Sequence, residues 1–492
     1  MKPFRKIFIE QVFKKLDKFD QFKETIPELK VAHDLCIRIE KLYPGSEALI
    51  VGGAVRDLIQ GKAPHDFDIA TNVDVESLKQ HFKLFDIGGK KFNTIGVSFE
   101  GYHFEVANFR VDEKNPESRK ATKTTKANTF KEDSARRDLT INSLGLNTKG
   151  EIEDYQNGIE DIKNNLIRTV GRPEDRYQED PLRILRTMRF SAKLGWNIED
   201  NTKKVTKELA STALKVSIER ITDELKKASS SGKSLANYIR LLDDNLLLQP
   251  FLPEIKALQK FEHNPIHHPE GNVFEHTMKA LESSKTNDPL TNLSILFHDI
   301  GKATTAGIHP DTGQPTYHGH EEQSTVIFEN LARRLKFSND EIDAIKYVVA
   351  NHMRAYKMGE MSKNKALQIR QSPYWDMLKQ VMIADQLARG GSLAELETQF
   401  QNVEQMIKTF GEKQVFEKRI SALINGNMII NIAKELGYVF NKTNAHYIGD
   451  VKNQLRDIII KKAFNVSSEE IAEEIKQKLN LIFEEKPENE DV

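Results

Sequence analysis

The 492-residue sequence has almost no cysteine, no long apolar run and almost no net charge. Its single cysteine, Cys36, excludes an internal disulfide and is typical of a reducing compartment. No run of roughly 18 apolar residues occurs, and the opening stretch "MKPFRKIFIEQVFKKLDKFD" lacks the apolar core of a secretory signal. We therefore expect a cytoplasmic protein with no membrane partner. The formal charge of −1 gives no overall signature of nucleic-acid binding, although local basic patches could still bind phosphates.

The distribution of hydrophobic patterns predicts an α+β protein of several domains, because one core rarely serves more than about 250–300 residues. Strand-like alternation is concentrated between residues 48 and 146, and helical spacing follows Pro181. The polar, basic segment 111–133 is expected to be a mobile loop. We predict an N-terminal helical extension (1–30), a mixed head with a small β-sheet and helices (31–165), and all-α neck (166–250), histidine-rich (251–400) and tail (401–492) domains.

Two carboxylates one residue apart form the most informative short motif. The stretch "VGGAVRDLIQGKAPHDFDIATN" (51–72) places Asp66 and Asp68 after an apolar run and a Gly–Gly pair. Residues i and i+2 of a strand face the same side, so both carboxylates should project together while Phe67 and Ile69 turn to the core. Such neighbours repel each other unless a cation lies between them. Mg²⁺ fits, because it takes oxygen ligands and bridges to substrate phosphates.

Neighbouring residues supply other parts of a phosphate site. Gly52 and Gly53 predict a tight turn whose backbone N–H groups approach a triphosphate, and Arg56 and Asp57 follow shortly after it. Glu105, on the polar face of "YHFEVANFR", is either a third catalytic carboxylate from a neighbouring strand or a surface residue. An isolated D-x-D is more often a solvated strand end, but this context favours a catalytic metal site.

Four further blocks follow in order. They are "GGKKFNTIGV" (88–97), "RRDLTINSL" (136–144), "EDPLRILRTMRF" (179–190) and "SIERITDEL" (217–225). Together with residues 51–72 they resemble the class II nucleotidyltransferases of the polymerase-β superfamily, which include bacterial CCA-adding tRNA nucleotidyltransferases and poly(A) polymerases. Three positions depart from the usual pattern of that family: Asn93, Leu139 and Ser143. The resemblance implies a Mg²⁺ site at Asp66 and Asp68.

The third block combines cations with polar groups. Arg136 and Arg137 suit triphosphate oxygens because guanidinium groups bind them bidentately. Asp138 and Asn142 could bond a ribose or orient the arginines. The alternative interpretation is a purely structural cluster of ion pairs.

The fourth block raises a choice between a capping and a base-reading role. Asp180 precedes Pro181, which is typical of a helix N-cap followed by proline at the first helical position. The resemblance implies instead that Asp180 and Arg183 bond the base edge of incoming C or A and reject G and U, with Arg186 and Arg189 on the same nucleotide-binding helix. The two roles are compatible because a carboxylate has two oxygens. In this family a flexible loop at 112–133 is associated with the switch from C to A addition, so its presence favours completion with A.

Histidine is concentrated in one region: nine of the 14 histidines lie from His263 to His352. Imidazole and carboxylate groups from several helices can build a one- or two-metal hydrolytic centre. The order H…HD…H…H…D resembles the HD phosphohydrolase superfamily. That resemblance implies a divalent transition metal, or Mg²⁺, held by His276, His298, Asp299 and Asp385, with His320 and His352 as further candidates; His263, His267 and His268 fit a loop or the substrate side better.

The combined layout resembles some bacterial CCA-adding enzymes, for which the family implies a secondary phosphatase or 2′,3′-cyclic phosphodiesterase activity. We expect template-independent addition of CCA to tRNA from CTP and ATP, with the tRNA recognised by shape and backbone charge. A poly(A) polymerase or an A-only adding enzyme shares all five blocks. A nucleotidyltransferase–HD regulator of a signalling protein, and a phosphohydrolase whose head only binds nucleotide, are alternatives from other classes. The oligomeric state is left open.

Overall fold

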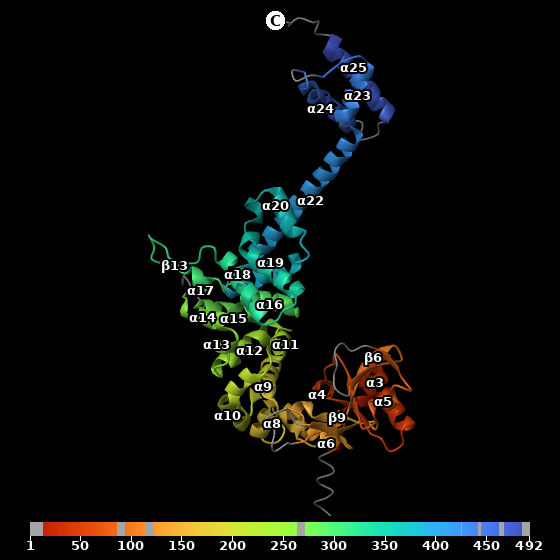
Figure 1. Ribbon diagram of the computed structural model, residues 1–492, viewed down its shortest axis with the longest axis vertical. Helices are drawn as coiled ribbons and strands as arrows, with labels where there is room; N and C mark the ends of the chain where they lie inside the picture. The colour runs from red at the N-terminus through yellow and green to blue at the C-terminus, as the bar shows by residue number, and fades with distance from the viewer. Residues whose placement is uncertain are drawn as a thin grey trace, which may run out of the picture. The chain divides into compact units, whose positions relative to one another are not determined.

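The computed structural model describes residues 13–85, 94–113, 123–262, 271–424, 426–440, 444–461 and 467–484. The predictions placed on His263, His267 and His268, on residues 88–93 and on the centre of the basic segment lie outside these residues. The chain forms two compact units. The first extends to residue 355 and includes 373–393, and the second contains 356–372 and the chain from residue 394 onward. Figure 1 colours the head red to orange, the neck yellow and the histidine-rich region green to cyan.

An eight-stranded mixed sheet forms the head, in the order β1-β10-β9-β2-β3-β6-β5-β4. The neighbouring strands are antiparallel except β3 and β6, which are parallel. β2 is buried along its whole length because strands flank it on both sides, which explains its uninterrupted apolar run. The strands are β1 (Phe13–Lys15), β2 (Ala48–Val51), β3 (Asp68–Thr71), β4 (Lys83–Phe85), β5 (Thr94–Phe99), β6 (Tyr102–Asn108), β9 (Leu144–Leu146) and β10 (Glu151–Asp154).

Helices pack on this sheet through apolar stripes. α3 begins with proline in its first turn and buries Leu29, Leu35 and Ile39 in the head core. The helices and 3₁₀ turn of the head are α2 (Phe19–Thr25), α3 (Pro27–Leu42), α4 (Gly53–Ile59), α5 (Val75–Leu78), α6 (Phe130–Ala135), η1 (Thr140–Asn142) and α7 (Gly158–Lys163).

The prediction of a purely helical N-terminal extension is wrong for the described residues. Phe13–Lys15 form strand β1, which pairs with β10 and satisfies backbone groups at the sheet edge. Leu16 and Phe19 are buried in the same apolar core as α3. This part of the chain therefore completes the head.

The prediction of a mobile loop over residues 111–133 also needs correction. β7 (Arg110–Glu113) and β8 (Lys123–Lys126) pair as an antiparallel ribbon, and α6 follows directly. α6 begins with a capping box in which Thr129 and Glu132 exchange side-chain and backbone hydrogen bonds. Strand pairing and a capped helix therefore order both ends of this segment.

The remainder of the first unit is almost entirely helical, as predicted. The neck contains β11 (Leu166–Ile167), α8 (Pro173–Glu179), α9 (Leu182–Leu194), β12 (Asn197–Ile198), α10 (Asp200–Leu209), η2 (Ala210–Lys215), α11 (Ile218–Ala228) and α12 (Gly232–Asp244). The histidine-rich region contains α13 (Leu248–Phe251), α14 (Pro253–Ala257), η3 (Leu258–Lys260), α15 (Val273–Ser283), α16 (Pro289–Phe297), α17 (Lys302–Thr305), β13 (Gly307–Ile308), β14 (Pro315–Thr316), α18 (His320–Arg334), α19 (Asn339–Ala355) and α21 (Trp375–Ala388).

The second unit has its own apolar core, formed by residues such as Ile429, Val451 and Ile475. Residues 356–372, which we predicted within the histidine-rich domain, belong to this unit. Its elements are η4 (Met358–Glu360), α20 (Lys363–Arg370), α22 (Leu393–Leu423), α23 (Gly426–Glu435), α24 (His446–Lys461) and α25 (Ser468–Glu484). Among the described residues, no helix combines the length and apolar character needed to cross a bilayer.

Candidate functional site

A cavity of about 640 Å³ brings together nearly all of the residues predicted for nucleotide binding and catalysis. Among the predicted residues, Asp57 does not line it and instead pairs with Arg56 at 2.8 Å. The predicted residues on its wall are Gly52, Gly53, Arg56, Asp66, Asp68, Glu105, Arg136, Arg137, Asp138, Asn142, Asp180, Arg183, Arg186 and Arg189. A wall with this many guanidinium groups suits a polyanion such as a triphosphate.

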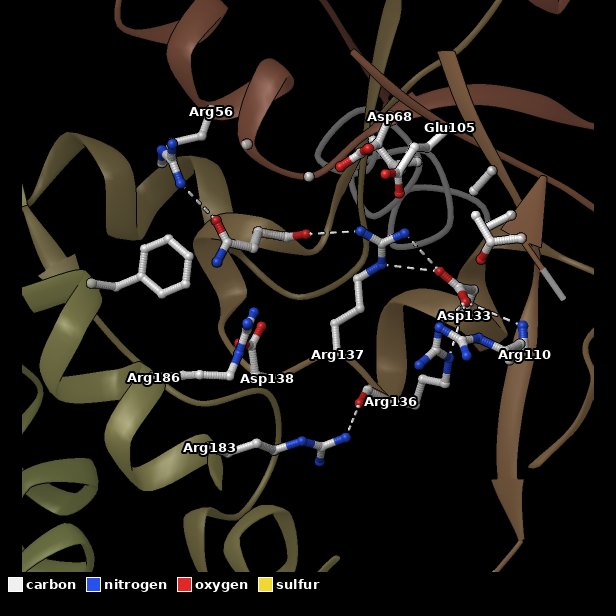
Figure 2. A pocket seen from close by; sticks show the side chains of 18 of the residues that line it. Arg56, Asp68, Glu105, Arg110, Asp133, Arg136, Arg137, Asp138, Arg183 and Arg186 are labelled. Carbon is white, nitrogen blue, oxygen red and sulfur yellow. Dashed lines mark hydrogen bonds and ion pairs between the residues drawn. The ribbon is translucent and has the colours of Figure 1, made fainter. Parts of the chain in front are cut away.

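Three carboxylates line this cavity, and two of them lie side by side. Asp68 begins β3, and Glu105 lies on the parallel neighbour β6 one residue before Val106, which pairs with Ile69. Asp68 and Glu105 are therefore level on adjacent strands, and Figure 2 shows their side chains next to each other. Asp66 lines the same cavity and is exposed, as is Asp68.

The alternation predicted for this stretch is confirmed, since Phe67 and Ile69 are buried in the head core. Oxygen ligands of this kind, open to solvent and flanked by cations, are what Mg²⁺ with bound nucleotide requires.

The Gly–Gly turn joins β2 to α4. Gly52 has φ 75° and ψ −129°, a conformation that residues with a Cβ rarely adopt. Its N–H donates to the carbonyl oxygen of Leu144 at 3.1 Å, which corrects the prediction that both glycine N–H groups face a triphosphate. Gly53 is the first residue of α4, where helix N–H groups have no partner within the helix.

One buried carboxylate, Asp133, holds two of the cavity's arginines. Its Oδ1 accepts from Arg136 at 2.8 Å, and its Oδ2 accepts from Arg137 at 3.0 Å (Figure 2). It also accepts the backbone N–H of Arg110 at 3.1 Å. Burial alone would raise the pKa of Asp133, but Arg137 and Arg136 outweigh it and hold that pKa below its usual value.

The sequence reasoning missed Asp133 as a site residue. The available signal was the spacing in "EDSARRD", which puts both arginines three and four residues beyond it, on the same face of a helical turn.

Asn142 links Arg137 to a further arginine, Arg56. Its side-chain oxygen accepts from Arg56 at 2.8 Å, and its backbone oxygen accepts from Arg137 at 3.1 Å. Arg56 and Arg137 thus lie on opposite sides of one residue of the third block. Asn142 orients these cations, one of the roles that the sequence allowed.

Acidic side chains also fix the arginines of α9. Asp138 accepts from Arg186 at 2.6 Å, and Glu224 accepts from Arg189 at 2.5 Å. Burial would raise the pKa of Asp138, but the charge of Arg186 and hydrogen bonds hold it below its usual value. Asp138 is therefore an ionised partner of the cavity's cations.

Asp180 and Arg183 are joined through the backbone, because the N–H of Arg183 donates to the carbonyl oxygen of Asp180 at 3.0 Å. Asp180 follows α8 with an extended backbone, and its Oδ1 accepts the backbone N–H of Leu182 at 3.1 Å, the hydrogen bond expected of a side chain that caps the start of α9. The same carboxylate forms a two-pronged ion pair with Arg220 of α11, at 3.2 and 2.7 Å. Arg220 lies in the fifth block, but nothing local indicated a partner 40 residues away.

The side chain of Arg183 is held by other groups of the protein. It donates to Glu179 at 2.7 Å and to the backbone oxygen of Arg136 at 2.8 Å. Both Asp180 and Arg183 line the cavity. These contacts fix the orientation of both side chains at the wall of the cavity.

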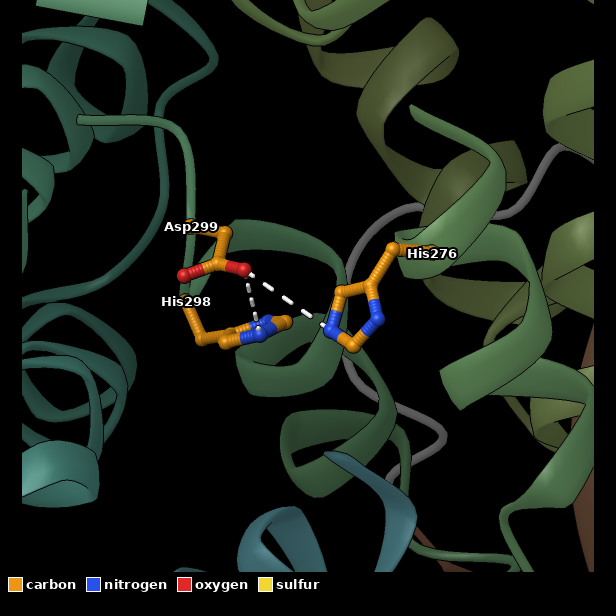
Figure 3. A group of neighbouring side chains, drawn as sticks. All are labelled: His276, His298 and Asp299. Carbon is orange, nitrogen blue, oxygen red and sulfur yellow. Dashed lines mark ion pairs between the residues drawn. The ribbon is translucent and has the colours of Figure 1, made fainter. Parts of the chain in front are cut away.

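The histidine-rich region contains a second, fully buried cluster. His276 on α15 and His298 after α16 lie 3.8 and 3.0 Å from the Oδ2 atom of Asp299 (Figure 3). His320 and His352 approach the other oxygen of Asp299, at 3.2 and 3.8 Å. Two groups with metal-ligand spacing therefore share the carboxylate of Asp299.

Asp385 on α21 completes this arrangement. Its Oδ1 lies 3.0 Å from Nε2 of His276, and its Oδ2 accepts from Arg389 at 2.6 Å. All six residues predicted for this site therefore lie together, delivered by helices far apart in the sequence.

The hydrogen bonds of three histidines test whether a metal fits. The Nδ1 atoms of His298, His320 and His352 lie 2.7–2.8 Å from backbone oxygens, which can only accept. In the neutral imidazole, Nδ1 then carries the proton and Nε2 carries a lone pair that faces the cluster. This is the usual arrangement of a histidine that binds a metal through Nε2. Nε2 of His320 lies 3.3 Å from Nε2 of His352, a contact that a shared proton or cation stabilises.

The charges around Asp299 favour the ionised carboxylate. Burial alone would raise its pKa, but His298 and Lys302 hold the pKa well below its usual value. Burial lowers the pKa of His352 to about 3, and the charge of His298 adds to this effect. The cluster thus offers an ionised carboxylate and a neutral His352, both of which suit metal binding. Burial alone would lower the pKa of His320, but the hydrogen bond to Asp299 and the charge of that carboxylate raise it.

Comparisons with known proteins agree with these two sites. Three family models match in order: the poly A polymerase head domain at residues 48–168, the "Probable RNA and SrmB- binding site of polymerase A" at 195–259, and the HD domain at 271–390. The CCA-adding enzyme of Ligilactobacillus salivarius is 28% identical over 92% of this chain and 98% of its own length.

Other relatives match over shorter segments. The CCA-adding enzyme of Lactobacillus helveticus is 36% identical over 47% of this chain and 56% of its own length. Poly(A) polymerase I of Escherichia coli is 35% identical over 51% of this chain and 56% of its own length. These matches thus span about half the length of these two curated relatives. A crystal structure of the Bacillus stearothermophilus CCA-adding enzyme in complex with CTP shares the fold, with a TM-score of 0.57, 19% identity and coverage of 94% of this chain and 100% of that one.

A polymerase-type head, an RNA-binding-type neck and an HD domain therefore define the class of protein. The chain is similar to CCA-adding enzymes and to a poly(A) polymerase, and it also matches the HD domain.

Proposed function

We propose that this protein adds CCA to the 3′ ends of tRNA, using CTP and ATP and no nucleic-acid template. The observation that carries the proposal is the cavity in which Asp66, Asp68 and Glu105 face a wall of arginines beside Asp180 and Arg183. The relative that aligns with 92% of the chain is a CCA-adding enzyme, which favours this activity over others of the family.

The residues of the cavity divide the work of nucleotidyl transfer. Asp66 and Asp68, with Glu105 beside them, would hold Mg²⁺, which neutralises phosphate charge and activates the attacking hydroxyl group. The arginines that Asp133, Asp138 and Glu224 hold in place would bind the triphosphate oxygens. Because these guanidinium groups are fixed beforehand, little ordering is required when the nucleotide binds.

Asp180 and Arg183 would read the base. A carboxylate accepts from the exocyclic amine that C and A share, and a guanidinium donates to the adjacent ring nitrogen. U and G present an oxygen where the amine would be, so the carboxylate would face an acceptor and repel it. The pair can thus accept both correct nucleotides with one set of side chains.

Extension of tRNA by single nucleotides tests the proposal. Purified protein with Mg²⁺ and tRNA lacking its last three bases should add two nucleotides with CTP alone and three with CTP plus ATP. Asp68→Ala should abolish extension, and Asp74→Ala, an exposed carboxylate shortly after the same strand, should not. A long ladder with ATP alone would establish a poly(A) polymerase, and addition of A only to tRNA ending in CC would establish an A-adding enzyme.

We propose a second activity for the HD cluster, a metal-dependent phosphohydrolase that acts on phosphate esters such as damaged RNA ends. The fixed tautomers of His298, His320 and His352 around Asp299 favour this function. A divalent transition metal or Mg²⁺ would be held by these groups with His276 and Asp385, and would polarise the phosphate.

Hydrolysis of 2′,3′-cyclic AMP and of p-nitrophenyl phosphate, with and without added Mn²⁺, Co²⁺, Ni²⁺ or Mg²⁺, tests the second activity. Activity that needs a metal and is lost in His298→Ala would support it. Extension of tRNA by the same His298→Ala protein controls for folding. Absence of hydrolysis with every metal would contradict it, and absence of both activities would return attention to a regulator of another protein.

A further inference from the structure

A lysine that no part of the proposed chemistry uses is buried within the HD cluster. Lys302 is 8% exposed, and its ammonium group lies 2.7 Å from Oδ2 of Asp299. The backbone N–H of Lys302 also donates to the carbonyl oxygen of Asp299, so a single turn delivers the ammonium group to the cluster. A buried ammonium group is costly to keep unless an anion compensates it.

The oxygen that Lys302 contacts is one that a metal would need. Oδ2 of Asp299 also lies 3.0 Å from Nε2 of His298 and 3.8 Å from Nε2 of His276. A divalent ion bound by these groups would lie close to the ammonium group, and like charges at this range in a buried site repel strongly.

The other carboxylate of the cluster offers a comparison. Asp385 pairs with Arg389, whose side chain is 28% exposed, whereas that of Lys302 is 10% exposed. Solvent can screen the first cation but not the second. Lys302 is therefore the cation with most influence on the charge of the metal-binding groups.

Lys302 also has an alternative location. Its ammonium group lies 5.6 Å from the ring centre of Tyr317, a half-buried residue that follows β14. The hydroxyl group of Tyr317 donates to the backbone oxygen of Glu262 at 2.6 Å, and its backbone oxygen lies 2.8 Å from Nδ1 of His320. The aromatic face is thus fixed beside the cluster and can stabilise the cation when it leaves Asp299.

We propose that Lys302 is the built-in counter-cation of the HD centre, which competes with the metal for Asp299 and moves toward Tyr317 and the anionic phosphate substrate when the metal binds. The proposal rests on the proposed metal-dependent function of this cluster. It implies that Lys302 neutralises the charge of Asp299 in the metal-free protein. It also implies that the site binds metal more weakly than the same ligands would without Lys302.

Metal titration of Lys302→Met tests this competition. Calorimetric titration with Mn²⁺ or Co²⁺ is carried out on the full chain carrying Asp68→Asn, which weakens metal binding by the head. Removing the ammonium group should lower the Kd of the HD site for the metal about tenfold, because the repulsion between this charge and the divalent ion is lost. The melting temperature should fall without metal and recover when metal is added, and KM for 2′,3′-cyclic AMP should rise.

A matched control is Lys346→Met, which removes a lysine that pairs with Glu329 on the surface of the same domain and should leave the Kd unchanged. Metal binding to the parent protein with an unchanged or higher Kd in Lys302→Met would overturn the proposal and leave the HD function standing. A parent protein that binds no metal at this site would overturn the HD function and the proposal together.

Discussion

At the scale of single residues, buried carboxylates arrange the cationic wall of the cavity. Asp133 is 1% exposed and contacts both Arg136 and Arg137. We give it a positioning role, in which it does not contact the substrate. Its contribution is to hold two guanidinium groups in one orientation, so its loss should affect nucleotide binding first.

Asp133→Asn should therefore raise KM for CTP and ATP by about 10- to 100-fold, since a hydrogen bond to a charged group contributes about 1.5–3 kcal/mol. Steady-state extension of tRNA with varied nucleotide concentration measures this change. Glu132→Gln makes the same chemical change at the exposed neighbouring residue. It should leave KM for both nucleotides within twofold of the value for the parent protein. Equal effects of both substitutions would contradict a positioning role for Asp133.

The same ion pairs give the head a defined response to acid. The pKa values of Asp133 and Asp138 lie below the usual value in the folded protein. Groups with a depressed folded pKa stabilise the protein above the unfolded pKa, about 3.9, and this contribution is lost as the pH falls through the folded pKa.

We expect the free energy of unfolding to fall as the pH drops below about 4, and to fall less steeply in Asp138→Asn, which is already less stable at pH 7. Urea denaturation at neutral and acidic pH measures both slopes. A steeper acid dependence in Asp138→Asn than in the parent protein would contradict this account.

At the scale of elements, the turn between β2 and α4 lies at the cavity, and β2 pairs with β3, which carries Asp68. Gly52 adopts a positive φ, whereas Gly53 does not, although the two are adjacent. A Cβ at Gly53 would meet the Arg56 side chain at 3.5 Å, which is ordinary contact. Only Gly52 of the two therefore has a backbone conformation that requires glycine.

Gly52→Ala should destabilise the head by about 1–3 kcal/mol, because the backbone there lies in a region that residues with a Cβ rarely adopt. Gly53→Ala should cost much less in stability. Chemical denaturation of the two variants measures the difference, and similar losses in both would mean that the turn relaxes to another conformation.

Local patterns could predict this turn, but not the contacts that complete the site. The Gly–Gly pair and the alternation around Asp66 and Asp68 lie within one short stretch of sequence. Their spacing along the chain is therefore enough to predict that they belong to one site. The partnership of Asp180 with Arg220 spans 40 residues and depends on how α9 and α11 pack. The ribbon formed by β7 and β8 was missed because its strands are polar, and strand pairing between polar segments leaves no hydrophobic period to detect.

At the scale of the whole molecule, one chain carries two sites built on different principles. The cavity of the head is open and lined by arginines, with exposed carboxylates at Asp66 and Asp68. The HD cluster is buried, and three of its histidines have tautomers fixed by backbone oxygens. The two sites share no residue, so their activities should be separable by substitution.

Asp66→Asn with Asp68→Asn should abolish tRNA extension and leave metal-dependent hydrolysis of 2′,3′-cyclic AMP within about twofold of the parent protein. Asp299→Asn should do the reverse, because it removes the carboxylate shared by both metal-ligand groups while the head is unchanged. Both assays are run on the same preparations, and melting curves confirm that each variant is folded. Loss of extension in a folded Asp299→Asn protein would show that the two sites are coupled, and the HD domain would then act on the polymerisation reaction itself.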